Sequence, residues 1–180
     1  MKFKSTLTSA SAFAALCLAS MPWLLASQSS VAAAAPASAA MAFPLAGSWT
    51  LVAADVLHPD GTRGHDYGAA PKGLLLIDAQ GRYSLQIFKS ERPRFASEDK
   101  RAGTPAEFEA ATLGASSHYG TIKADMATHT LVFSIEHSAF PNWEGTQQKR
   151  MYELNGDELS YRVPARADGN IPVSVWRRMD

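Results

Sequence analysis

Short stretches that alternate apolar and polar positions recur along the chain from Leu45 onward. Such alternation is typical of a half-buried β-strand, because successive side chains of a strand point to opposite faces of its sheet. The turn signals AQG, NGD and ADGN lie between these stretches and suit tight hairpins. About eight strands at this spacing predict an all-β antiparallel barrel or sandwich. The predicted strands are WTLVAADVL, GLLLID, RYSLQIF, HYGTIKAD, THTLVFSIEHS, TQQKRMYEL, ELSYRV and IPVSVWRR.

One short helix is predicted between the strands, in TPAEFEAATLGAS. Thr104 is placed as its N-cap, Pro105 at its first position, and Glu107 three residues after the cap, where a capping box needs it. Gly114 is placed to end it. The polar segment KSERPRFASEDKRAG comes just before. Long excursions of this kind either cover the mouth of a site or remain solvated loops, and the sequence favours neither.

The first forty residues differ in character from the rest. Lys2 and Lys4 precede the apolar run SAFAALCLASMPWLLA, and the small residues VAAAAPASAA follow. This order is typical of a cleaved secretory signal peptide, so residues 1–40 are predicted to be a signal and linker, with cleavage between Ala33 and Ala40. A membrane anchor is disfavoured because the run is short and contains Pro22. The protein is therefore expected in the periplasm or outside the cell, with residues 41–180 as its single domain and no stable membrane insertion.

Composition excludes several classes of function. Loss of Lys2 and Lys4, with no acidic residue in the first forty positions, shifts the formal net charge from 0 to −2. With no basic run, nucleic-acid binding is not expected. The only cysteine, Cys17, leaves with the signal, so the mature chain forms no internal disulfide. No P-loop, GxGxxG, HExxH or paired CxxC occurs, and neither a cofactor nor a metal site is predicted.

The first predicted strand opens with Gly47-Ser48-Trp49. A glycine followed by a large indole at this place predicts that Trp49 plugs one end of the barrel. Arg177 or Arg178, on the last strand, is expected to stack on the indole ring.

Alternation also divides the polar side chains between faces. Ser84 and Gln86 share one face of RYSLQIF, and Leu131, Phe133, Ile135 and His137 share one face of THTLVFSIEHS. If the apolar faces point inward, Ser84, Gln86 and Glu136 are simply solvated. A ligand-binding barrel can instead place some polar groups inside. Both arrangements remain open from the pattern alone.

Six segments of the chain together resemble the bacterial lipocalin-like domain family. They are LAGSWTLV, GRYSLQIFKSERPRFAS, GTPAEFEA, HYGTIKAD, SIEHSAFPNWEGTQQKR and LNGDELSYRVP, which lie between Leu45 and Arg178. The resemblance implies an eight-stranded antiparallel calycin-type barrel with a small-molecule cavity. The chain departs from the family pattern at His137, where a small residue is usual.

Polar residues on the matching segments are the candidate site. Glu136 and Arg150 are expected to face one another inside the barrel across the hairpin turn Pro141-Asn142-Trp143, either as part of a ligand site or as an ion pair that fixes strand register. His118 is either a general base or a structural hydrogen-bonding group, and Trp143 is either a lid or a packed turn residue. The full set of predicted ligand-binding residues is Ser84, Gln86, Arg94, His118, Glu136, Asn142, Trp143, Gln148 and Arg150.

Three functions are consistent with these patterns. The first is an exported carrier or sensor for a small, largely apolar molecule with one polar or anionic group. The second is a cofactor-free enzyme (isomerase, cyclase, lyase or hydrolase) in which His118 or Glu136 is the catalytic acid or base. The third is an interaction module with a filled barrel. Fold alone does not choose among them.

Overall fold

The structure, a computed structural model, describes residues 43–180. The predicted signal peptide lies outside the described residues. Among residues 43–180, no helix combines the length and the apolar character that crossing a membrane requires.

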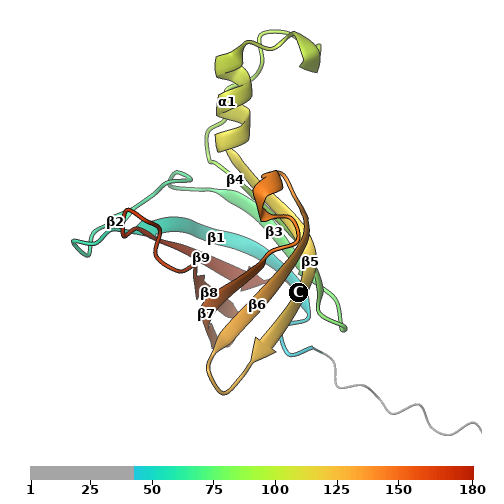
Figure 1. The fold of residues 1–180 in the computed structure, drawn as a ribbon, viewed down its shortest axis with the longest axis vertical. Helices are drawn as coiled ribbons and strands as arrows, with labels where there is room; N and C mark the ends of the chain where they lie inside the picture. The colour runs from blue at the N-terminus through green and yellow to red at the C-terminus, as the bar shows by residue number, and fades with distance from the viewer. Residues whose placement is uncertain (1–42) are drawn as a thin grey trace, which may run out of the picture. The chain divides into compact units, whose positions relative to one another are not determined.

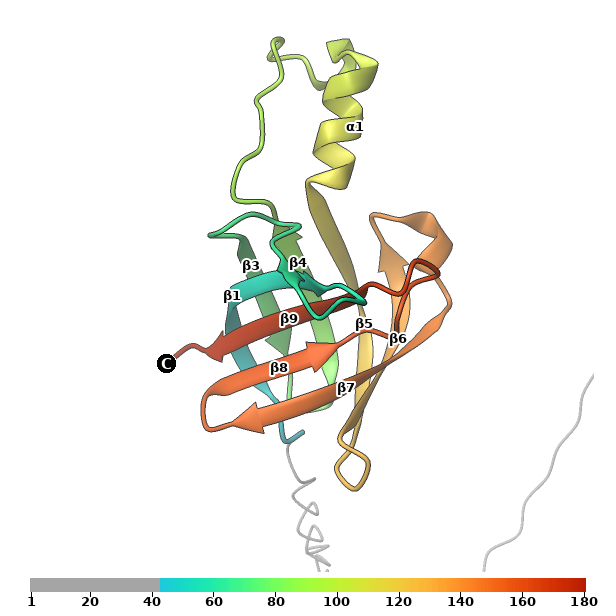
Figure 2. The same ribbon diagram turned by 90° about the vertical axis from the view of Figure 1, so that its left-hand side faces the viewer.

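The described chain forms a closed antiparallel β-barrel (Figures 1 and 2). Every strand from β3 to β9 pairs with the next, and β1 pairs with both β3 and β9, which closes an eight-stranded barrel. The two-residue β2 pairs with β1 at its edge as one extra strand. The predicted all-β barrel with one short helix is thereby confirmed. The elements are β1 (Gly47–Leu57), β2 (Arg63–Gly64), β3 (Lys72–Ile77), β4 (Arg82–Phe88), η1 (Lys100–Ala102), α1 (Pro105–Leu113), β5 (Ala115–Asp125), β6 (Thr130–Ser138), η2 (Pro141–Trp143), β7 (Gln147–Asn155), β8 (Glu158–Arg162) and β9 (Ile171–Arg178).

The barrel interior is packed with the apolar faces of the strands. Leu75, Leu85, Leu131, Phe133 and Leu159 are buried and come from four different strands. Burial of these side chains is the main stabilising contribution, at roughly 25 cal/mol for each Å² of apolar surface removed from water. The period of two in the sequence therefore reports correctly which face of most strands points inward.

Trp49 closes one end of the barrel, as predicted. Its side chain is fully buried, and its indole N–H donates to the carbonyl oxygen of Leu45 at 3.1 Å. Of the two candidate arginines, Arg178 stacks on the ring, with its guanidinium carbon 4.1 Å from the ring centroid. Arg178 also donates to the carbonyl oxygen of Ala46 at 2.6 Å, so the plug, the first strand and the last strand are held together.

A β-bulge interrupts the pairing of β5 with β6. His137 lies opposite Tyr119 and Ile135 lies opposite Gly120, which leaves Glu136 as an extra residue on β6. The extra residue reverses the alternation, since a single insertion moves every later side chain to the other face. The predicted common face of Ile135 and His137 is therefore wrong: Ile135 is buried, while His137 is exposed and packs on Tyr119 with ring centroids 5.5 Å apart.

The helical excursion extends beyond the ends of β4 and β5 (Figure 2). Thr104 and Glu107 form the predicted capping box, and the helix ends at Gly114. No residue of α1 is buried. The helix is braced mainly by Phe95, whose ring lies edge-on to Phe108 at 5.4 Å. The excursion does not line the barrel cavity, so of the two alternatives the solvated one fits the structure better.

Candidate functional site

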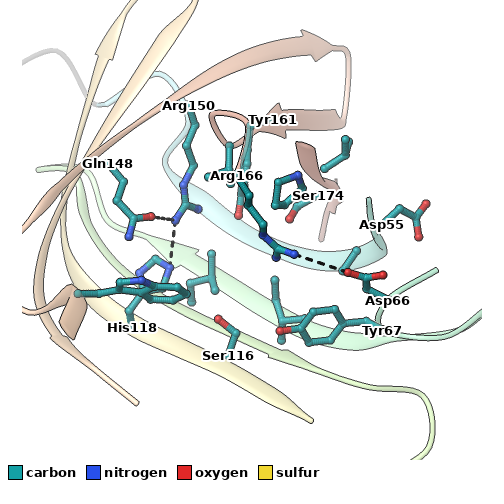
Figure 3. A pocket seen from close by; sticks show the side chains of 17 residues that line it. Asp55, Asp66, Tyr67, Ser116, His118, Gln148, Arg150, Tyr161, Arg166 and Ser174 are labelled. Carbon is teal, nitrogen blue, oxygen red and sulfur yellow. Dashed lines mark hydrogen bonds and ion pairs between the residues drawn. The ribbon is translucent and has the colours of Figure 1, made fainter. Parts of the chain in front are cut away.

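A cavity of about 340 Å³ lies inside the barrel (Figure 3), and Trp49 is not among the residues that line it. Six strands, two loops and η2 contribute walls that are mostly apolar, with a few polar groups. The lining residues are Ala54, Asp55, Asp66, Tyr67, Leu85, Ile87, Ser116, His118, Trp143, Gln148, Arg150, Tyr161, Val163, Arg166, Pro172, Val173 and Ser174. A mostly apolar cavity of this size with a few convergent polar groups is typical of a small-molecule site.

Arg150 is the buried charge of this cavity. It lies opposite Leu131 in the pairing of β6 with β7, so it shares the inner face of the barrel and is only 5% exposed. Its guanidinium carbon is 4.0 Å from the centroid of the Phe133 ring and 5.0 Å from that of Tyr161. Contact with two aromatic rings fixes the plane of the guanidinium and partly offsets its loss of water.

Hydrogen bonds tie Arg150 to two further lining residues. Its Nη2 donates to Oε1 of Gln148 at 2.9 Å and to Nε2 of His118 at 3.3 Å. Because arginine is a donor only, Nε2 of His118 must accept, and the imidazole proton lies on Nδ1. Nδ1 then donates to the hydroxyl oxygen of Tyr83 at 2.7 Å. Both ring nitrogens of His118 are thus engaged, by an arginine and a tyrosine.

This environment keeps His118 neutral. Burial, and secondly the charge of Arg150, lower the pKa of His118 from 6.5 to about 3. Burial likewise raises the pKa of Tyr83, although Arg150 opposes the shift. Neither group is charged at neutral pH. A histidine with so low a pKa, and with Nε2 already accepting a bond, is poorly suited to take a proton from a bound molecule.

We expect the free energy of unfolding of the ligand-free protein to fall by about 2 kcal/mol between pH 8 and pH 5 because of His118. In the unfolded chain the imidazole has its ordinary pKa of 6.5, whereas the folded site holds it at about 3. Between these values only the unfolded chain binds the proton. The stability is therefore intact above pH 6.5 and is lost progressively as the pH falls toward 3.

Urea unfolding at a series of pH values measures this effect. The His118→Gln variant is the control, because glutamine cannot take up the proton. Between pH 8 and pH 5, the free energy of unfolding of the variant should fall by about 2 kcal/mol less than that of the wild type. Wild-type and variant curves with the same slope between pH 6.5 and pH 5 would show that His118 is not buried as a neutral group.

Two buried donors in the site have no partner among the described residues. They are Nε of Arg150 and the hydroxyl of Tyr161, which is 1% exposed. Within residues 43–180, no carboxylate forms an ion pair with Arg150. A buried donor without an acceptor costs free energy, and an unbalanced buried charge costs more. Neither donor atom has surface exposed to the cavity, so what the inner end offers to a molecule that enters is the positive charge of Arg150.

The other charged lining residues are already paired near the mouth. Buried Asp55 accepts from Nε of Arg63 at 2.6 Å and contacts Nδ1 of His65 at 2.9 Å. Asp66 and Arg166, on two different loops, form an ion pair at 3.9 Å. Figure 3 shows this second pair well separated from Arg150.

Four of the predicted site residues line the cavity together: His118, Trp143, Gln148 and Arg150. Trp143 lies on η2, the predicted turn, with its ring edge-on to His118 and the centroids 6.0 Å apart. It is half-buried, and Phe140 packs against its other side at 5.5 Å. The indole thus forms one wall of the site and belongs to the packed turn as well.

The other predicted site residues lie outside the cavity. Ser84 and Gln86 are on the outer face of β4, because Leu85 and its apolar neighbours point inward. Arg94 belongs to the excursion and lines a separate surface hollow, and Asn142 is exposed on the turn. None of the four is placed to contact a molecule in the barrel.

The predicted pairing of Glu136 with Arg150 is wrong. Glu136 follows inward-facing Ile135 on β6, so it points outward, and its carboxylate lies 3.7 Å from Nη2 of Arg82 on the barrel surface. Arg150 points inward from the neighbouring strand. The catalytic role considered for Glu136 therefore loses its geometric basis.

Several lining residues were not predicted from the sequence, above all Tyr161. Its signal was present, because alternation in ELSYR places Tyr161 on the same face as apolar Leu159. Tyr67 and Ser116 had no such signal, since a loop and the start of β5 bring them together only in the fold. Burial raises the pKa of Tyr67, and a hydrogen bond with Ser116 moderates the shift.

Within residues 43–180, no three histidine, cysteine, aspartate or glutamate side chains converge as a metal site would require. The charged donor that does line the inner end of the cavity is the guanidinium of Arg150. This group binds oxygen acceptors rather than cations.

Comparison with known proteins gives two matches. A family model described as a lipocalin-like domain matches residues 46–179. A curated relative, the 4'-hydroxy-3'-methoxypropiophenone carrier protein ppsC of Aspergillus oryzae, is 29% identical over 106 residues, covering 53% of this chain and 96% of that protein. No solved structure gives a significant match.

Proposed function

Because the chain belongs to the lipocalin-like domain family, we propose that it is a carrier that binds one small, largely apolar molecule inside its barrel. The observation that carries this proposal is the cavity of about 340 Å³ whose inner end holds a buried arginine without a counter-charge. In a filled barrel without a ligand site, an apolar side chain of similar size would cost less free energy to bury than Arg150 does.

The geometry favours carriage over catalysis. His118 is neutral, and its Nε2 accepts a bond from Arg150. Glu136 points away from the cavity. Both proton-transfer groups that the enzyme alternative requires are thus unsuited or misplaced, whereas a carrier needs only the cavity and a polar anchor. The curated relative is itself named as a carrier.

The ligand we propose is a flat molecule with an oxygen-bearing polar end. Tyr67, Trp143 and Tyr161 provide aromatic walls, while Leu85 and Ile87 add aliphatic surface. Aromatic walls favour aromatic ligands through stacked and edge-to-face contacts. The relative is named for an aryl ketone, a molecule of this general kind. In this chain Arg150 would hold the polar end.

We also propose that the carrier works outside the cytoplasm. The basic start at Lys2 and Lys4, the apolar run and the small residues before residue 41 support cleavage and export. An exported carrier of this kind would take up its ligand in the periplasm or the surroundings of the cell.

Native mass spectrometry of the full chain expressed in its own host tests both proposals. We expect a mass increment equal to one small molecule per chain, which is lost on denaturation, and a chain that begins between Ala33 and Ala40. A wild-type protein that never carries a molecule, even after incubation with extracts of its host, would contradict the carrier. A chain that retains its first residues would contradict export and leave the carrier standing.

A further inference from the structure

We propose that the ligand is an organic monoanion, an aromatic carboxylate whose charged oxygens lie against the guanidinium of Arg150. This inference rests on the proposed carrier function and specifies the chemical class of its ligand. It is distinct from binding of a neutral ketone or alcohol, which the carrier function by itself would allow.

Charge distinguishes the inner end of the cavity from its mouth. Asp55 is balanced by Arg63, and Asp66 is balanced by Arg166. Arg150 is the one charged lining residue for which the described part of the chain provides no opposite charge. His118 cannot supply it, because a neutral imidazole carries none. A bound anion would therefore supply the negative charge that Arg150 lacks in the protein and form an ion pair with it.

The guanidinium also has a donor left for an anion. Both of its hydrogen bonds leave from Nη2, so Nη1 forms none with the described residues. Nε and the hydroxyl of Tyr161 have no partner either, but both atoms are closed off from the cavity. Figure 3 shows the side chains of Arg150 and Tyr161 reaching into the cavity from neighbouring strands. An arginine with a free guanidinium nitrogen is a good match for a carboxylate.

The donors are held in place before any ligand arrives. The guanidinium carbon of Arg150 lies 4.0 Å from the centroid of the Phe133 ring. Hydrogen bonds to Gln148 and His118 hold its Nη2. Nδ1 of His118 is in turn anchored by Tyr83. A preorganised guanidinium loses little conformational entropy on binding. The difference in affinity between a charged and a neutral ligand is therefore not reduced by a cost of rearrangement.

Shape limits the rest of the ligand to one or two rings. A volume of about 340 Å³ is at the small end of the range of ligand pockets, which extends from about 300 to 1,000 Å³. Tyr67 and Trp143, with the ring of Tyr161, leave flat surfaces for a planar body. A second charge on the ligand would be left without a partner, since the mouth charges are already paired. A monoanion is therefore favoured over a dianion.

Isothermal titration calorimetry with two probes of nearly equal shape tests this inference. The probes are 2-naphthoate, which is an anion, and 2-acetylnaphthalene, in which a methyl group replaces the charged oxygen. We expect the wild-type chain, freed of any bound molecule, to bind the naphthoate about 10- to 100-fold more tightly, the usual worth of a charge-assisted hydrogen bond. Arg150→Met should abolish this preference, while Arg150→Lys should retain part of it.

Arg162→Met is the matched control. Arg162 lies on β8 next to Tyr161 but is exposed, so its loss removes the same charge from outside the cavity. The preference for naphthoate should survive in this variant. A melting curve for each variant shows that it is folded, and Arg150→Lys keeps the test decisive if the methionine variant does not fold.

The outcomes separate this inference from the carrier proposal. Equal or tighter binding of 2-acetylnaphthalene by the wild type would overturn the anion inference and leave the carrier intact. A preference that Arg162→Met abolishes as fully as Arg150→Met would also overturn it, because general surface charge would then be responsible. Failure of both probes to bind would overturn the anion inference and count against the carrier as well.

Discussion

We expect the Trp49→Ala variant to lose about 3–5 kcal/mol of its free energy of unfolding. The side chain is fully buried, and its removal leaves a large cavity at the closed end of the barrel. The variant also loses the hydrogen bond to Leu45 and the stacking of Arg178, whose guanidinium carbon is 4.1 Å from the ring centroid. For a domain of this size the melting temperature should fall by roughly 10–15 °C.

Chemical denaturation of the wild type and two variants measures this loss. Trp49→Phe is the graded control, because phenylalanine keeps most of the plug but has no N–H for Leu45. It should lie between the wild type and the alanine variant. Trp49 does not line the cavity, so probe affinity at a temperature where the alanine variant is folded should be unchanged. A loss of stability below about 1 kcal/mol would mean that the end of the barrel is not closed by this residue.

The Gly120→Ala variant should be destabilised by about 3 kcal/mol or more. A Cβ at this position would overlap the carbonyl oxygen of Ser134, and it would lie 2.9 Å from the backbone nitrogen of Glu136. Both neighbours are backbone atoms of the bulge on β6, so neither can move aside without breaking the pairing of β5 with β6. Gly120 is only two residues from His118, and the change should also disturb the cavity.

Gly145→Ala provides the comparison for this second variant. Gly145 has a φ of 71°, where an L-residue is strained, but a Cβ there would meet nothing within 4 Å. Its replacement should cost only about 1 kcal/mol. Equilibrium unfolding of the two variants therefore separates steric overlap from backbone strain. If both lose the same free energy, the close approach at the bulge is not what requires a glycine at position 120.

The barrel could be predicted from sequence because its evidence is local. Alternation in each stretch identifies a strand and its buried face, and Thr104 with Glu107 identifies the helix start from four residues. These patterns depend on neighbours in the chain and survive in the fold. The plug also follows from a local motif, although only the structure chooses Arg178 over Arg177 as the residue that covers Trp49.

The candidate site was predictable only in part, and the failures have different physical causes. His118, Gln148 and Arg150 lie on strands whose alternation continues without interruption to the cavity, and their inward direction could be read from it. Glu136 points outward, as regular alternation after Ile135 requires, so its predicted inward position set that pattern aside. His137 lies beyond the bulge, which reverses the alternation and has no reliable signature in a single sequence.

Partners across the barrel could not be predicted from one sequence either. The unpaired state of Arg150 depends on what every facing strand contributes to the interior, and such contacts join residues far apart in the chain. Alternation gives the inward direction of Tyr161 on β8 and of Ser174 on β9, but it does not show that they share a cavity with Arg150. The sequence identified the arginine, but it assigned to that arginine a carboxylate that the fold points toward solvent.

The excursion between β4 and β5 has a consequence for the evolution and engineering of this chain. Its two ends are already joined at the barrel, because the backbone N–H of Lys89 donates to the carbonyl oxygen of Gly114 at 3.0 Å. The cost of closing such a loop rises by only about 0.6 kcal/mol for each doubling of its length. Segments of very different size can therefore be exchanged here while the barrel keeps its register. A peptide tag or a new recognition element can therefore be inserted between β4 and β5, in a segment that contributes no residue to the cavity.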